Sequence, residues 1–270
     1  MPPKDDKLAQ PDYDLPEILK KVRAQTPARL LAGRSGAAYR TSTQLELREA
    51  HAAARDAVQA ELNLSTDFGG DFVQRWNLFE ACSQATSKEE YLLRPDLGRH
   101  LNEASRAEIS KRCTTGHDLQ LVIGDGLSVT AVVRQVPQLL PLLYERAKMR
   151  SWTVGEIFVI HYCRVGILNE IGALLTPKVA VLLIGERPGL ATAESLSAYM
   201  AYQPKASDTD ANRNLISNIQ ARGVSTEQAA ERILNLAAAM MKTQKSGCQL
   251  REELPPAFRH PENRLPEVSR

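Results

Sequence analysis

Three short apolar runs in the middle of the chain restrict its possible folds most strongly. They are LQLVIG at 119–124, EIFVIHY at 156–162 and VAVLLIG at 179–185. Nearly continuous apolar runs of this length are typical of parallel strands that helices bury on both faces. The segments between them are long enough for helical crossovers. The pattern predicts an α/β fold, with a doubly wound, Rossmann-like and mostly parallel sheet flanked by helices.

The first hundred residues have helical patterns instead. We expect one helix to begin at Asp14, a second to run from Thr43 to about Leu62, and a third to begin near Asp71. The apolar residues expected on the third helix are Phe72, Trp76 and Phe79. A further helical pattern covers Leu97 to Arg112. The amino-terminal region should therefore be helical.

Helices are also expected around and after the apolar runs. Between the first two runs, apolar residues recur at helical spacing, with Pro137 at the expected helix start. Beyond Tyr202 we expect helices from Ala211 to about Gln220 and from Ser225 to about Lys245. The latter opens with Ser225-Thr226-Glu227-Gln228, a capping-box pattern.

These patterns divide the chain into four parts. Residues 1–14 are a polar, flexible lead, and residues 15–96 form the helical amino-terminal region. Residues 97–247 form the Rossmann-like domain, and residues 248–270 are a Pro-rich tail without a core of its own.

Composition argues against several classes of function. The 34 Lys and Arg nearly balance the 32 Asp and Glu, so the basic excess of a nucleic-acid binder is missing. The longest apolar run, Val179 to Ile184, is too short for a membrane span, and the first ten residues lack the apolar core of a signal peptide. We therefore expect a cytoplasmic protein. The four cysteines have no C-x-x-C spacing, which favours reduced thiols over a metal site.

Ligands of doubly wound sheets bind beyond the carboxyl ends of the strands, so the loops after the three runs are the candidate sites. The first loop is GDGLS, with Asp125 and with Ser128 as a helix cap; it lacks a third glycine at Val129, and a purely structural turn is the alternative. The second loop carries Arg164 and Val165, just past the second run.

The third loop is GERPG, which places Glu186 and Arg187 between two glycines. A local ion pair on a rigid turn is the alternative to a binding role. The sequence has no G-x-S-x-G elbow and no H-E-x-x-H, and we assign no catalytic residue. Two hypotheses stay open: a cofactor-binding subunit whose chemistry lies elsewhere, or a stand-alone α/β enzyme acting on a nucleotide or acyl substrate.

Several motifs together resemble one family. They are TPARLLAGRSG (26–36), YLLRPDLGRHL (91–101), DLQLVIGDGLS (118–128), YCRVG (162–166), LLIGERPGL (182–190), ESLSAY (194–199) and ISNI (216–219). In this order and spacing they resemble the small, or light, subunit of ethanolamine ammonia-lyase. The similarity extends from about Leu15 to Gly247.

The resemblance implies an adenosylcobalamin-dependent lyase that converts ethanolamine to acetaldehyde and ammonia. It implies a large TIM-barrel subunit that carries the substrate site, an assembly of six copies of each subunit, and cobalamin between the two chains. The cofactor would supply radical chemistry, and the small subunit would enclose it. Enteric relatives carry a longer amino-terminal extension linked to packaging in bacterial microcompartments, whereas the first helix of this chain is expected near Leu15. Whether this chain is also packaged in such a compartment stays open.

The resemblance also implies specific cobalamin contacts. These fall on Val165, on Glu186 and on Leu215, the residue before ISNI, where relatives commonly have cysteine. Four further candidates come from loop position alone: Arg164, Arg187, Asp125 and Ser128.

Overall fold

A six-stranded sheet forms the centre of the computed structural model, which describes residues 17–24, 33–189 and 192–253. The strands, in their order across the sheet, are β3 (Phe79–Cys82), β5 (Phe158–His161), β4 (Leu119–Gly124), β6 (Val179–Gly185), β7 (Leu196–Tyr202) and β8 (Asn214–Ile219). The first four are parallel, whereas β7 runs antiparallel to both of its neighbours. The predicted α/β class and mostly parallel sheet are confirmed.

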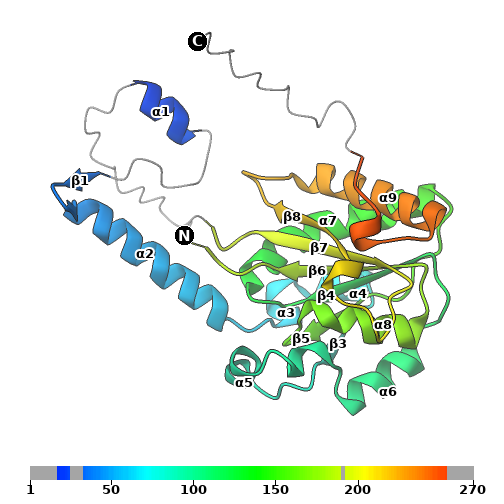
Figure 1. The fold of residues 1–270 in the computed structure, drawn as a ribbon. Helices are drawn as coiled ribbons and strands as arrows, with labels where there is room; N and C mark the ends of the chain where they lie inside the picture. Colours follow the sequence, from blue (N-terminus) through cyan, green and yellow to red (C-terminus); the bar gives the residue numbers. More distant parts are fainter. Residues whose placement is uncertain (1–16, 25–32, 190–191, 254–270) are drawn as a thin grey trace, which may run out of the picture.

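Helices cover both faces of this sheet (Figure 1). On one face lie α7 (Val129–Met149) and α9 (Thr226–Thr243); on the other lie α6 (Glu103–Arg112) and α8 (Leu168–Leu175). Residues of one strand alternate between the two cores. In β4, Leu121 and Ile123 join the core under α7 and α9, whereas Val122 joins the opposite core. Because both faces are covered, the parallel strands are apolar at nearly every position.

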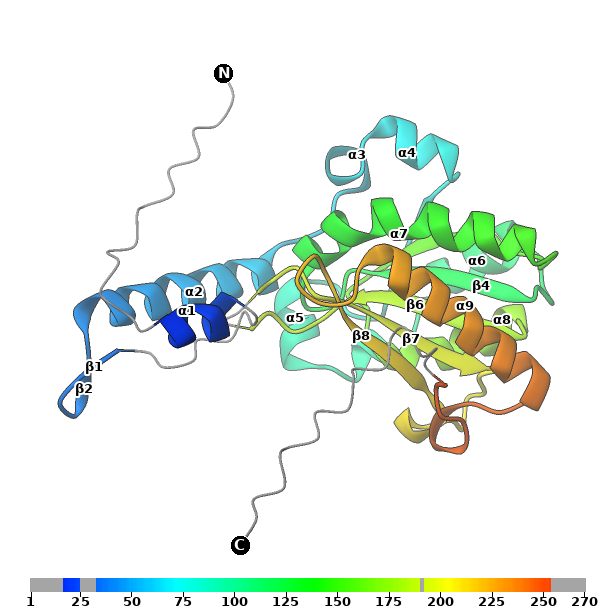
Figure 2. The ribbon, with the colours of Figure 1, turned by 90° about the horizontal axis from the view of Figure 1, so that it is seen from above.

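The amino-terminal region is mainly helical, as predicted. Its elements are α1 (Glu17–Ala24), a small hairpin of β1 (Arg34–Ser35) and β2 (Ala38–Tyr39), α2 (Thr41–Gln59), α3 (Leu64–Asp67), α4 (Gly70–Arg75) and α5 (Lys88–Leu93). The long helix α2 extends away from the sheet, and only Thr43 and Ala57 of it are buried (Figures 1 and 2). The expected start of the first helix at Asp14 lies outside the described residues.

Two of the strands lie where the sequence predicts helix. The helix near Asp71 stops at Arg75, because Asn77 adopts a left-handed conformation at φ 45° and turns the chain. Phe79 then begins β3 and packs into the core on the α6 side. The expected helix over 211–220 is instead a short 3-10 turn, η3 (Asp210–Asn212), followed by β8. Its residues Ile216 and Ile219 pack under α9, and pairing with β7 holds them extended.

Two helix boundaries also differ from expectation. The helix over 97–112 is divided into a 3-10 turn, η1 (Leu97–Arg99), and α6, which Asn102 caps by accepting a hydrogen bond from the Ser105 amide at 2.8 Å. Pro137 lies inside α7 rather than at its start, because the helix begins earlier, where Ser128 caps it by accepting a hydrogen bond from the Ala131 amide at 3.3 Å.

The last long helix, α9, follows the prediction closely. Ser225 caps α9, and its side chain and that of Gln228 form the expected capping box. A last 3-10 turn, η4 (Gly247–Gln249), follows this helix. Within the described residues, no helix combines the length and the apolar character needed to cross a bilayer.

Candidate functional site

The carboxyl ends of β4, β5 and β6 meet at one edge of the sheet. Gly124, the last residue of β4, pairs with Ile160 of β5 on one side and with Ile184 of β6 on the other. The three loops singled out in the sequence therefore leave the sheet side by side. This is the edge at which ligands bind in doubly wound sheets.

Glu186 is the first residue after β6, and its carboxylate is held by three hydrogen bonds. The Ser195 hydroxyl donates to Oε2 at 2.8 Å. The Ser197 hydroxyl and the backbone amide of Asn218 donate to Oε1, at 2.6 and 2.8 Å. The Glu186 side chain is half-buried. It is thus a fixed carboxylate at an edge that a ligand can still reach.

Arg187 does not pair with this carboxylate. Its side chain is exposed, and although both residues lie in the described part of the chain, no ion pair joins Glu186 to Arg187. The alternative of a local ion pair between the two glycines therefore does not describe this loop. Glu186 is fixed by neighbouring strands instead.

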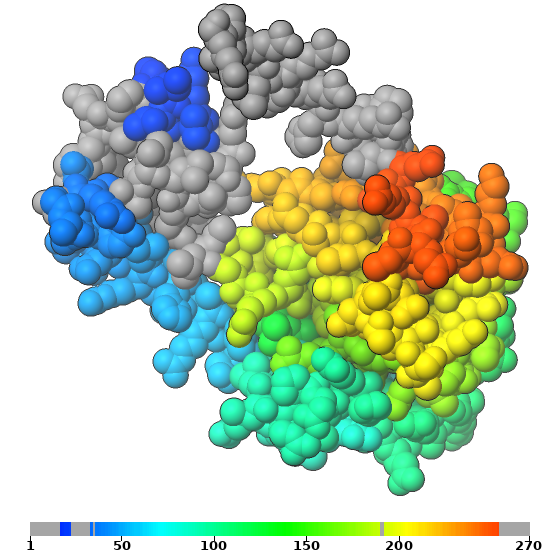
Figure 3. Space-filling view, in the orientation of Figure 1, coloured from blue at the N-terminus to red at the C-terminus, as the bar shows by residue number. Residues whose placement is uncertain are grey.

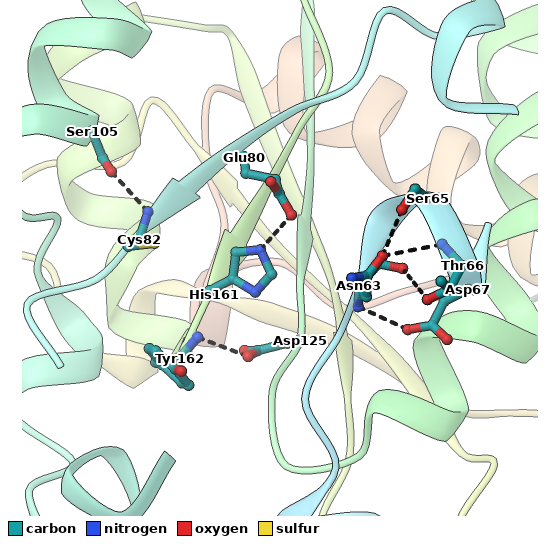
Figure 4. A network of polar contacts seen from close by, with 10 residues as sticks. All are labelled: Asn63, Ser65, Thr66, Asp67, Glu80, Cys82, Ser105, Asp125, His161 and Tyr162. Carbon is teal, nitrogen blue, oxygen red and sulfur yellow. Dashed lines mark hydrogen bonds and ion pairs between the residues drawn. The ribbon is translucent and has the colours of Figure 1, made fainter. Parts of the chain in front are cut away.

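Asp125, directly after β4, is 1% exposed and holds the loop after β5 (Figure 4). Its Oδ2 accepts a hydrogen bond from the Tyr162 amide at 2.8 Å, and its Oδ1 accepts one from the Cys163 amide at 2.9 Å. Tyr162 has φ 55°, a left-handed conformation that a residue with a large side chain seldom adopts. The two hydrogen bonds stabilise this turn, and thereby the position of Arg164 and Val165.

A buried lysine accompanies the buried carboxylate. Lys88, on α5, is 4% exposed, and its Nζ donates to the Gly126 carbonyl at 3.4 Å. Burial raises the pKa of Asp125, and both the charge of Lys88 and the two backbone hydrogen bonds oppose this rise. Burial likewise lowers the pKa of Lys88, and the charge of Asp125 opposes that shift. Each group therefore favours the charged form of the other.

Tyr91, also on α5, fixes the same loop from the other side. It is fully buried, and its hydroxyl donates to the Cys163 carbonyl at 3.0 Å. The Arg164 guanidinium lies 4.3 Å from the centre of the Tyr91 ring, and its Nη2 donates to the Tyr91 carbonyl at 3.3 Å. The Arg164 amide donates to the Gly98 carbonyl at 2.8 Å. Arg164 thus turns toward α5 and locks the loop.

Sequence reasoning missed Lys88 and Tyr91. No local pattern marks them, because they reach the loops from more than 35 residues away along the chain. The only available signal was the motif YLLRPDLGRHL, which contains both Tyr91 and Gly98.

Ser128 performs the predicted capping role and is fully buried. Its Oγ accepts a hydrogen bond from the Ala131 amide at 3.3 Å and donates to the Ala193 carbonyl at 2.5 Å. The backbone of Ser128 also packs directly against Gly185, where a Cβ atom would overlap its carbonyl oxygen. The first and third loops are therefore packed together, and the side chains of Asp125 and Ser128 are occupied by partners within the chain.

His161 and Cys82 lie near this edge but form no ligand cluster. His161 Nε2 lies 3.0 Å from Glu80 Oε1, and the Cys82 amide donates to Ser105 Oγ at 2.8 Å (Figure 4). Among the residues that the structure describes, no three His, Cys, Asp or Glu side chains are grouped as metal ligands.

Comparison with known proteins decides the family. A family model described as the ethanolamine ammonia-lyase light chain (EutC) matches residues 16–251, most of the chain. The chain belongs to the ethanolamine ammonia-lyase light-chain family. The resemblance seen in the sequence motifs is therefore confirmed, and the matched residues include all three loops of the site.

Individual members of the light-chain family are similar over most of their length. Proteins named ethanolamine ammonia-lyase small subunit match from Clostridium perfringens at 39% identity, covering 87% of this chain and 78% of the relative, and from Clostridium acetobutylicum at 38% identity, covering 88% and 97%. The counterpart from Pseudomonas putida is 40% identical and covers 86% of both chains.

In this light chain, the resemblance points to three positions on different elements. Val165 follows β5, Glu186 follows β6, and Leu215 lies within β8. Val165 begins a 3-10 turn, η2 (Val165–Ile167), and is half-buried against the core on the α8 side. Leu215 lies within β8 and is 44% exposed. Glu186 reaches β8 through the Asn218 amide, three residues beyond Leu215.

Proposed function

We propose that this chain is the small subunit of an adenosylcobalamin-dependent ethanolamine ammonia-lyase, which converts ethanolamine to acetaldehyde and ammonia. In this proposal it covers the cobalamin at an interface with a large TIM-barrel subunit, and that subunit carries the substrate site. Membership of the light-chain family supports the subunit role. The observation that carries the cofactor role is the fixed, half-buried carboxylate of Glu186 at the ligand-binding edge of the sheet.

The residues at this edge, together with Leu215 on the adjoining part of β8, fit a corrin in chemical character. A corrin has an apolar ring system with a rim of amide side chains. The exposed Leu215 and the half-buried Val165 offer apolar surface, and Glu186 offers an acceptor for amide N–H groups. Arg187 is exposed beside Glu186 and can reach a ligand at the same edge. We therefore assign Val165, Glu186, Leu215 and Arg187 as contacts.

The remaining candidates act on the position of these contacts. Asp125 and Tyr91 hold the backbone that leads to Val165 through hydrogen bonds to the loop after β5. Lys88 lies buried near Asp125, and Arg164 fixes the same loop to α5 through its hydrogen bond to the Tyr91 carbonyl. Ser128 fixes the start of α7 against the loop of Glu186. Side chains that their own neighbours hold in place keep a binding surface rigid, which lowers the cost of ordering it when a ligand binds.

The small subunit's part in the reaction is to bind, orient and exclude water. When bound, adenosylcobalamin supplies the radical chemistry of the reaction. The half-buried carboxylate and the apolar side chains of this chain would fix the cofactor's rim and keep water from the covered face. The substrate's amino and hydroxyl groups would be handled by the large subunit, in an assembly for which we propose six copies of each chain.

Reconstitution with the large subunit tests this function. The purified chain alone should produce no aldehyde from ethanolamine, and the co-expressed complex should produce it only with adenosylcobalamin present. Light scattering should show a large hetero-oligomer. Aldehyde formation by the single chain, or a stable monomer that ignores the large subunit at micromolar concentration, would contradict the proposal. A thermal shift caused by a nucleotide or acyl ligand, and not by a cobalamin, would favour the stand-alone enzyme instead.

A further inference from the structure

Tyr199 lies in the middle of β7, beside the proposed cofactor contacts. It pairs in register with Leu215 of β8. Side chains two residues apart on a strand share a face, so Tyr199 lies on the same face as Ser197, which binds Glu186. Tyr199, Leu215 and Glu186 are therefore neighbours on one face of β7 and β8.

This face of β7 and β8 is the one away from α9. Leu196, Ala198 and Met200 point into the core under α7 and α9, whereas the Tyr199 ring packs at the edge of the opposite core. On that opposite side α8 packs on β6. In Figure 3 the segments that contain β7 and β8, coloured yellow-green to gold, reach the surface. Tyr199 is half-buried there and Leu215 is 44% exposed.

The hydroxyl of Tyr199 is available to a ligand. No residue in the described ranges makes a hydrogen bond to it, whereas the hydroxyl of the fully buried Tyr91 is bound to the Cys163 carbonyl. The nearby Arg213 guanidinium does not compete with the Tyr199 hydroxyl as a donor to a ligand. The Arg213 side chain is 4% exposed, forms an ion pair with Asp210, and donates to Asn169 Oδ1 at 2.7 Å. Tyr199 thus presents an apolar ring and a free donor on the same surface.

The charge state of this hydroxyl suits a donor. Burial raises the pKa of Tyr199, and the nearby carboxylates of Glu186 and Asp210 raise it further, against the effect of Arg213. The phenol is therefore neutral near pH 7 and keeps its proton. Together the two residues can bind both polar groups of an amide: the Glu186 carboxylate can accept a hydrogen bond from the amide N–H, and the Tyr199 hydroxyl can donate one to the amide C=O.

We propose that Tyr199 is a further cobalamin contact, with its ring against the edge of the corrin and its hydroxyl donating to the carbonyl of a corrin amide side chain. This inference rests on the proposed function. It extends the contact surface from the strand end at Glu186 along β7 and β8 to the middle of the sheet.

The test is a titration of the assembled two-subunit complex with cyanocobalamin, followed by absorbance or calorimetry. Tyr199→Phe removes only the hydroxyl and should raise the dissociation constant about three- to tenfold, the effect of one neutral hydrogen bond. Tyr199→Leu also removes the ring and should weaken binding further. Tyr202→Phe is the matched control, because Tyr202 lies on the same strand but packs toward α9; it should stay within about twofold of wild type.

The outcomes separate the two proposals. Failure of the wild-type complex to bind cyanocobalamin would overturn the proposed function and this inference with it. Binding by wild type together with an unchanged dissociation constant in Tyr199→Phe would overturn this inference alone. If Tyr199→Leu fails to assemble, Tyr199→Phe still decides the question, because it keeps the ring that packs on the core.

Discussion

The carboxylate of Glu186 accepts a hydrogen bond from the backbone amide of Asn218 at 2.8 Å, although β7 lies between their two strands. The hydroxyls of Ser195 and Ser197 donate hydrogen bonds to the same carboxylate. One side chain thus joins the end of β6, the start of β7 and the end of β8. A ligand that binds Glu186 contacts a point held by three strands.

Glu186→Gln should separate the charge of this residue from its shape. The amide oxygen can still accept from Ser197 and Asn218, and the amide nitrogen can donate to Ser195, so the free energy of unfolding should change by less than about 1 kcal/mol. Loss of charge-assisted hydrogen bonds should weaken cobalamin binding by about 1 to 3 kcal/mol. Titration of the reconstituted complex with cyanocobalamin measures this change.

Glu194→Gln is the matched control for that experiment. Glu194 lies near the same edge, but its carboxylate is an exposed partner of Arg134, at 3.5 Å. Exposed ion pairs contribute little to the free energy of unfolding, so this substitution should change neither the stability of the protein nor its affinity for cobalamin appreciably. Equal cobalamin affinities for Glu186→Gln and wild type would show that Glu186 only ties strands together.

Stability at high pH should depend on the Cys113 thiol. Burial raises the pKa of this thiol from its ordinary value of 9.0 to about 12. The unfolded chain therefore loses the proton above pH 9 while the folded chain keeps it, so the free energy of unfolding falls as pH rises from 9 toward 12. The contribution is fully present below pH 9, and its loss amounts to about 1.4 kcal/mol for each pH unit in this window.

Cys113→Ala should remove that slope. Denaturant unfolding of the variant and of wild type at pH 8 and pH 10 should show a stability difference that changes by about 1.4 kcal/mol between the two conditions. Cys248→Ala, at an exposed cysteine, should follow the wild-type profile. Parallel pH profiles for Cys113→Ala and wild type would contradict the prediction.

The central strands could be predicted from sequence because burial on both faces leaves a continuous apolar run. The first and third runs coincide with β4 and β6, residue for residue. The strands at the two edges could not. Phe72, Trp76 and Phe79 have helical spacing although Phe79 belongs to β3. Ile216 and Ile219 are also three residues apart, because an irregularity in the pairing of β7 with β8 lets both point to the same core.

The site was predictable in position but not in detail. The predicted parallel direction of the strands places the loops of Asp125, Val165 and Glu186 at one edge, since parallel strands end together. The partners of these residues are set by long-range packing. Nothing local in the sequence links Glu186 to Asn218, 32 residues away, or the loop after β5 to Tyr91, 72 residues from Cys163.

Gly185→Ala should disturb the contact between two of the loops. A Cβ atom at Gly185 would overlap the backbone carbonyl of Ser128, and backbone cannot move aside as a flexible side chain can. Overpacking of this kind should lower the free energy of unfolding by about 2 to 3 kcal/mol. Gly70→Ala is the control, because a Cβ there meets no atom within 4 Å and Gly70 begins a helix. Comparable stabilities for the two variants would show that the loops can separate without cost.

Asp125→Asn should loosen the loop that carries Val165. The asparagine amide would face one of the two backbone N–H groups that Asp125 now binds, and Lys88 would remain buried without the opposing charge. We expect the free energy of unfolding to fall by about 2 to 3 kcal/mol. Cobalamin affinity of the complex that still assembles should fall as well, because Val165 follows the freed segment. Denaturant unfolding and cyanocobalamin titration measure the two effects.

Two further variants show whether the buried pair is responsible. Asp71→Asn changes an exposed aspartate at the start of α4 and should leave stability within about 0.5 kcal/mol of wild type. Adding Lys88→Met to Asp125→Asn removes the unpaired charge, so the double variant should regain part of the lost stability. Strictly additive losses from the two single substitutions would mean that Lys88 and Asp125 do not interact. The loop after β5 would then depend on the two backbone hydrogen bonds and Tyr91 alone.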